Sequence, residues 1–148
     1  MVRRLFVIGL TLVCLEGLSA NPARATDTVY TVQVDGRPLT EDPKDTGALS
    51  HDGVVYVDVV KITKAYSGLL TFSDGGATVT VSIEKRTAAF TKGRPVARLD
   101  TGSMKLSGAP FIYNGDLYVP ITAFARFAKS KVKIDKAARV AQLVAPGA

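Results

Sequence analysis

Basic side chains are the most conspicuous chemical feature of this sequence. They gather toward the C-terminal end, in a segment relieved only by Asp135. The basic cluster consists of Arg126, Lys129, Lys131, Lys133 and Lys136. On a strand, Lys131, Lys133 and Asp135 would share one face, because side chains alternate along a strand. Such a surface would attract anionic glycans, phospholipid head groups or teichoic-type polymers. The alternative interpretation is a solvated face that protects a sheet edge from aggregation.

Residues suited to catalysis or metal binding are sparse. His51 is the only histidine and Cys14 the only cysteine, which excludes a histidine-rich metal centre and a disulfide scaffold. His51 lies beside Asp52 at an expected turn, and no Gly-x-Ser-x-Gly segment supplies a nucleophile. The remaining candidates are aspartates at or near glycines, as turn formers are: Asp35, Asp52, Asp74 and Asp116. We therefore expect no catalytic residues, no metal and no cofactor. The alternative is a small secreted hydrolase that uses converging carboxylates or His51.

The first 25 residues have the pattern of a secretory signal peptide. Arg3 and Arg4 precede an apolar run over 5–15, and Ala23-Arg24-Ala25 fits the usual cleavage pattern. Cleavage after Ala20 is the alternative. The apolar run is too short to span a membrane, which needs about 20 residues. We therefore expect export to the periplasm or the extracellular space, with no stable membrane insertion after cleavage.

Length and composition fit one folded domain over 26–148. The chain has 148 residues, of which 47% are hydrophobic and 22% charged, and its formal net charge is +6. This is close to the composition of an ordinary globular protein. Nucleic acid is not an expected partner, since export removes it from reach and no aromatic residues are interleaved with the basic cluster.

An internal repeat organises the chain, with copies at about 51–83 and 113–144. The segment HDGVVYVDV, which begins at His51, aligns with YNGDLYVPI, which begins at Tyr113. In each copy an Asx-Gly turn precedes a short strand and then an amphipathic helix. Asp58 is the expected N-cap of the first helix and Gly68 its C-terminal stop. Two further strands complete each copy.

The remaining segments predict further strands and loops. Residues 29–34 alternate as a strand and end at a hairpin turn, and 87–90 and 96–99 flank another turn. Residues 102–110 are expected to be irregular. The sequence thus predicts an α+β fold, a mostly antiparallel β-sheet with two short helices, built from two similar strand-helix-strand repeats.

The order of motifs resembles a known family. Val32 to Leu39 (VQVDGRPL) precedes a glycine turn, a Tyr-Val-Pro segment and a helix, and the second copy matches best, with Asn114-Gly115 and Tyr118-Val119-Pro120. In the first copy, Asp58 replaces the proline. Over about residues 29–144 this resembles the copper amine oxidase-like N-terminal domain, or stalk domain, of exported bacterial proteins. The resemblance implies an accessory domain, because copper and the quinone cofactor belong to a separate catalytic domain of those oxidases.

Together these observations predict a non-catalytic, exported binding or scaffold domain. Its expected partner is an anionic cell-envelope polymer or a protein, contacted through the basic cluster. An inhibitor or a chaperone-like periplasmic protein is a further alternative. The sequence leaves open whether a homodimer forms through a sheet face or edge.

Overall fold

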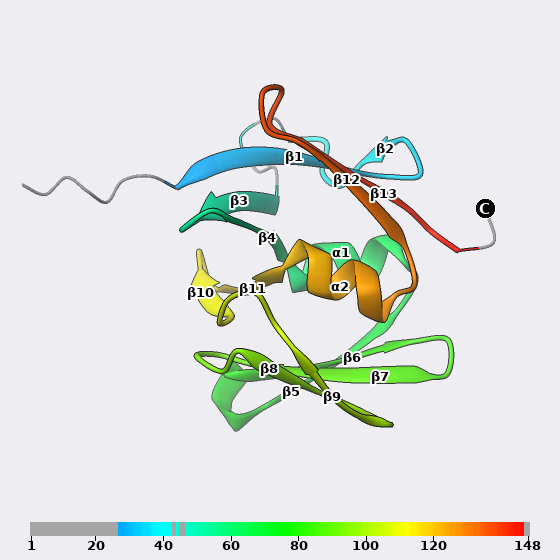
Figure 1. The fold of residues 1–148 in the computed structure, drawn as a ribbon. Helices are drawn as coiled ribbons and strands as arrows, with labels where there is room; N and C mark the ends of the chain where they lie inside the picture. The colour runs from blue at the N-terminus through cyan, green and yellow to red at the C-terminus, as the bar shows by residue number, and fades with distance from the viewer. Residues whose placement is uncertain (1–26, 43, 45–46, 147–148) are drawn as a thin grey trace, which may run out of the picture.

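The computed structural model describes residues 27–42, 44 and 47–146. The predicted signal peptide lies outside these residues. In the described part of the chain, two short helices lie between two β-sheets, which we call sheet A and sheet B (Figure 1). An α+β fold built mostly from antiparallel strands is therefore confirmed.

Sheet A contains the strands from both ends of the described chain. Its order is β10-β11-β4-β3-β1-β13-β12, with β2 paired to β1. Its strands are β1 (Thr28–Val34), β2 (Arg37–Pro38), β3 (Gly47–His51), β4 (Val54–Asp58), β10 (Phe111–Tyr113), β11 (Asp116–Pro120), β12 (Lys131–Asp135) and β13 (Val140–Val144). Among the described strands, only the β1–β13 pair is parallel, with Thr31 opposite Val140. This pair places the first and last described strands side by side.

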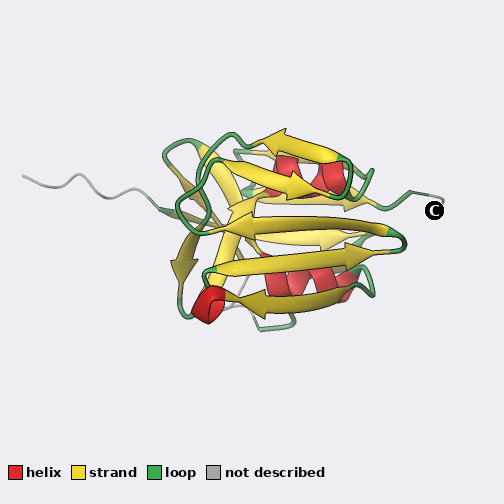
Figure 2. Ribbon diagram, turned by 90° about the horizontal axis from the view of Figure 1, so that it is seen from below, coloured by secondary structure: helices red, strands yellow, loops and turns green. Residues whose placement is uncertain are grey.

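Sheet B is a five-stranded antiparallel meander. Its order follows the chain: β5 (Leu69–Ser73), β6 (Thr78–Ile83), β7 (Arg86–Thr91), β8 (Val96–Leu99) and β9 (Gly102–Lys105). A single 3-10 turn, η1 (Asp74–Gly76), joins β5 to β6. Val79, Val81 and Phe90 point inward and are buried, while threonines alternate with them on the outer side. Seen from below, the strands of this sheet cross in front of both helices (Figure 2).

The two helices begin at the end of a buried strand of sheet A. Helix α1 (Val59–Ala65) follows β4, and the Asp58 carboxylate accepts hydrogen bonds from the backbone N–H groups of Val60 and Lys61, as an N-cap does. Helix α2 (Ile121–Phe127) follows β11 and has Pro120 at its N-cap. Ile62 and Phe124 are fully buried, so each helix directs an apolar stripe into the core.

One hydrophobic core connects the sheets and the helices. It includes Val32 of β1, Val57 of β4, Phe90 of β7 and Phe124 of α2, all fully buried. A smaller apolar cluster lies on the other side of sheet A, where Tyr56 and Tyr118 pack with Leu49 and Phe111. Both tyrosines are buried, but in this cluster and not in the main core.

Two local predictions are wrong. Residues 102–105 form strand β9, although 102–110 was expected to be irregular; this four-residue edge strand has too little alternation to be recognised, and it depends on pairing with β8. Gly68 does not reverse the chain after α1. Ser67 does so, with a φ of +58°, and Gly68 instead permits close packing, because a Cβ there would lie 2.8 Å from the Ser82 carbonyl oxygen.

Across the described residues, neither helix has the length and apolar character that a membrane crossing requires.

Candidate functional site

The basic cluster runs along one edge of the molecule. Lys131 and Lys133 lie on β12, the last strand of sheet A, and point to solvent while Val132 and Ile134 face the core. Lys136 lies in the turn between β12 and β13. All five side chains of the cluster are exposed, and none forms an ion pair with a residue that the structure describes. The cluster is therefore a strip of unpaired positive charge.

Arg126 and Lys129 differ from the other members because they also line a cavity of about 500 Å³. Arg126 comes from the last turn of α2, and Lys129 lies in the turn after that helix. Arg86 of β7 and Lys105 of β9 line the same cavity. Its apolar wall consists of Leu99, Met104 and Phe127, and Asp100 is its one acidic lining residue.

Arg86 occupies an unusual position. It lies on the same side of β7 as the buried Ala88 and Phe90, at the end of the strand. Its Nη1 lies 3.5 Å from a carboxylate oxygen of Glu84. Nε and Nη2 are buried and have no hydrogen-bond partner among the described residues. A buried guanidinium donor without an acceptor is costly, so Arg86 retains unsatisfied capacity to bind an anion.

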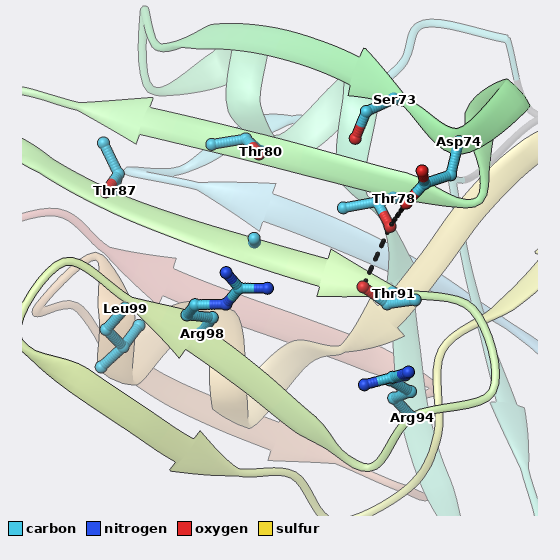
Figure 3. Close-up of a pocket in the computed structure, with 10 residues that line it drawn as sticks. Ser73, Asp74, Thr78, Thr80, Thr87, Thr91, Arg94, Arg98 and Leu99 are labelled. Atoms are coloured by element: carbon cyan, nitrogen blue, oxygen red, sulfur yellow. Dashed lines mark hydrogen bonds between the residues drawn. The ribbon is translucent and has the colours of Figure 1, made fainter.

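The outer face of sheet B carries a second cavity, of about 420 Å³ (Figure 3). Hydroxyl groups line it: Ser73, Thr78, Thr80, Thr87 and Thr91. The Thr78 hydroxyl lies 3.1 Å from Asp74 Oδ2 and 3.1 Å from the Thr91 hydroxyl. Arg94 and Arg98 lie along the other side of this surface, in Figure 3. The surface can therefore hydrogen-bond a polar ligand.

Asp58 and Asp116 form a pair of carboxylates around Lys61. Lys61 Nζ lies 3.1 Å from Asp58 Oδ2 and 3.7 Å from Asp116 Oδ2. Burial raises the pKa of Asp58 to about 6, hydrogen bonding with Asp116 adds to the rise, and Lys61 opposes it. Asp58 also caps α1, so the carboxyl group with the raised pKa lies at the start of a helix.

His51 does not have the surroundings of a catalytic base. Its Nδ1 lies 2.8 Å from Asp27 and its Nε2 lies 3.4 Å from Asp52. Both ring nitrogens thus face carboxylates, and no hydroxyl or thiol is hydrogen-bonded to the ring within the described residues. The ring also contacts Tyr56 and Phe111 at the edge of the small aromatic cluster. This arrangement offers no activated nucleophile.

Metal ligands do not converge in the part of the chain that the structure describes. No group of three or more histidine, cysteine, aspartate or glutamate side chains is placed to hold an ion there.

Two cavity residues were missed by the sequence analysis. Arg86 and Lys105 are distant in sequence from Arg126 and Lys129, and only the packing of sheet B against α2 brings them together. The outer threonines had a sequence signal, the alternation of Thr78 and Thr80 with buried valines, but Arg94 and Arg98 had none.

Comparison with known proteins identifies the family. A family model, the copper amine oxidase N-terminal domain, matches residues 33–143. No curated protein and no solved structure gave a significant match. The matched span extends from β1 to β13 and so includes both sheets, both helices and the cavities described above. The chain therefore belongs to the family of copper amine oxidase N-terminal domains, non-catalytic stalk-type domains that are typically exported.

Proposed function

We propose that this chain is an exported, non-catalytic binding or scaffold domain that contacts an anionic cell-envelope polymer through the basic cluster. The observation that carries the proposal is the exposure of all five cluster side chains without ion-pair partners in the described structure. Unpaired surface cations raise the local concentration of polyanions and speed their association.

The shape of the cluster favours an extended partner. Lys131 begins β12 and Lys133 follows on the same face, and a strand rises about 3.3 Å per residue, so these two lysines are separated by roughly 7 Å, with Lys136 in the turn just beyond the strand. Arg126 and Lys129 extend the charge to the end of α2. A linear strip of this kind matches a repeating polyanion better than a compact ligand. Its lysines also discourage another strand from pairing with the β12 edge.

We also propose that the rigid scaffold behind the strip arose from a duplicated unit, with copies at about 51–83 and 113–144. Two observations support this. Strand β11 begins 62 residues after β4, α2 begins 62 residues after α1, and β12 begins 62 residues after β5. In the β4–β11 ladder, Val57 pairs with Val119, its counterpart in the other copy.

Chromatography on heparin-agarose tests the binding proposal. The informative variant replaces four lysines of the cluster: Lys129→Gln, Lys131→Gln, Lys133→Gln and Lys136→Gln. Its matched control removes the same charge from four exposed lysines elsewhere: Lys44→Gln, Lys64→Gln, Lys85→Gln and Lys92→Gln. We expect retention of the wild type to fall steeply with salt, and the cluster variant to elute much earlier than the control.

Equal elution of the cluster variant and the control would contradict the proposal, because net charge alone would then explain retention. Retention that does not depend on salt would contradict it as well. The alternative of a hydrolase predicts that His51→Ala abolishes function. We expect His51→Ala to leave heparin retention unchanged, since His51 is the last residue of β3 and is not part of the basic cluster.

A further inference from the structure

We propose that the cavity between β7, β9 and the end of α2 binds the phosphate monoester group of an anionic ligand. The inference deepens the proposed function and rests on it only in treating Arg126 and Lys129 as part of a binding surface. It adds two residues outside the basic cluster, Arg86 and Lys105, and a defined place on the fold.

The first argument is convergence. Four basic side chains from separate parts of the chain line one cavity: Arg86, Lys105, Arg126 and Lys129. They come from β7, from β9, from α2 and from the turn after α2. Like charges brought together by tertiary packing repel one another. A bound anion would relieve that repulsion, so the cavity is electrostatically suited to an anion.

The second argument is the amount of charge. Asp100 is the one carboxylate among the lining residues, and Glu84 lies 3.5 Å from Arg86, so the four positive groups exceed these two negative groups by two. A phosphate monoester carries a charge of about −1.5 to −2 near neutral pH, whereas a carboxylate carries only one negative charge. The phosphate group therefore matches the lining charge better than a carboxylate does.

The third argument is the geometry of the donors. Arg86 lines the cavity, and its Nε and Nη2 are buried with no acceptor among the described residues. A planar guanidinium presents a fork of N–H donors that fits two oxygens of one phosphate. Acceptor oxygens delivered by a ligand would satisfy donors that the protein itself leaves unpaired.

The fourth argument concerns the rest of the ligand. Leu99, Met104 and Phe127 provide an apolar wall beside the charged side chains. A cavity of about 500 Å³ lies within the range of small-molecule sites, roughly 300–1,000 Å³. The cavity thus has room for a phosphate group and for an apolar part of the molecule that carries it.

Isothermal titration calorimetry with three probes tests this site on the full chain. We expect phenyl phosphate to bind more tightly than inorganic phosphate, because its ring reaches the apolar wall, and both to bind more tightly than benzoate. Arg86→Gln and Arg126→Gln should each weaken phenyl phosphate binding at least tenfold. Arg37→Gln is the matched control, since Arg37 is exposed on β2 of sheet A, far from β9 in Figure 1, and we expect it to leave the affinity unchanged.

If Arg86→Gln disturbs the fold, Arg126→Gln still tests the site, because Arg126 is exposed on α2. Equal weakening by Arg37→Gln, unchanged affinity in folded Arg126→Gln, or tighter binding of benzoate than of phenyl phosphate would each overturn the inference. Heparin retention separates the two proposals. A wild-type protein that binds phenyl phosphate but is not retained on heparin contradicts only the polymer proposal, and one that is retained on heparin but does not bind phenyl phosphate contradicts only the cavity proposal.

Discussion

Val57 and Val119 lie directly opposite each other where β4 meets β11, and neither side chain is exposed. The two valines occupy the same place in the two copies of the proposed repeat. The contact lies between the second and third strands from the β10 edge of sheet A, and it faces the core that both helices share.

Truncating either valine should destabilise the whole molecule. We expect Val57→Ala and Val119→Ala each to lower the free energy of unfolding by about 2–3 kcal/mol, because each removes buried methyl groups from a packed core. Since the side chains are neighbours, the double variant should depart from additivity by at least about 0.5 kcal/mol. Urea denaturation measures these values, with Val29→Ala, at an exposed site, as the control. Two separate unfolding transitions would contradict a shared core.

Asp58 should make stability depend on pH in a defined direction. Its pKa is raised from 3.8 to about 6 in the folded protein, mainly by burial and then by Asp116. A raised pKa means that the folded state holds the proton more tightly than the unfolded chain. The stabilisation from Asp58 is therefore fully present below about pH 4 and is lost as the pH rises through about 6.

Asp58→Asn isolates this contribution, because asparagine also caps helices but does not titrate. We expect the difference in unfolding free energy, wild type minus variant, to fall by about 2–3 kcal/mol between pH 4 and pH 7.5. Asp116→Asn should move the midpoint of that change to lower pH, since it removes one cause of the raised pKa. A difference that stays constant across this range would show that Asp58 titrates normally.

The turn after α1 allows a paired test of backbone conformation. Ser67 has a φ of +58°, which disfavours any residue with a Cβ, so Ser67→Gly should stabilise the protein by about 0.5–1 kcal/mol. Gly68→Ala should destabilise it by 2 kcal/mol or more, because the new Cβ would meet the Ser82 carbonyl at 2.8 Å and Thr63 at 2.9 Å. Thermal unfolding would measure both. If Ser67→Gly destabilised the protein and Gly68→Ala stabilised it, the residue that reverses the chain would be Gly68 and not Ser67.

Much of the fold could be predicted because its signals are local. The Asx-Gly turns, the N-cap at Asp58 and the apolar stripe that includes Phe124 depend on residues a few positions apart. The cavity could not be predicted. Arg86 and Arg126 approach each other only after sheet B packs against α2, and a sequence carries no local signal for such packing. Strand β9 was missed because it is short, alternates too little and depends on pairing with β8.

The lysines of β12 should also prevent self-association. This strand ends sheet A, and its exposed face carries Lys131 and Lys133 beside the exposed Val144. We expect Lys131→Val with Lys133→Val to increase the apparent molecular mass in size-exclusion chromatography with light scattering, because the edge would become apolar and open to pairing. The control is Lys85→Val with Lys92→Val, at exposed turns. If the apparent mass of the Lys131→Val and Lys133→Val variant is unchanged, these lysines do not protect the β12 edge from pairing.

The most direct test of the binding account is an NMR titration of ¹⁵N-labelled protein with a heparin-derived octasaccharide. The account predicts that amide shifts concentrate at residues 126–136, along the end of α2 and β12, and that they disappear as salt is added. Shifts centred instead on the hydroxyl-lined outer face of sheet B, around Thr78, Thr80 and Thr91, would contradict it. So would the absence of any shift at low salt.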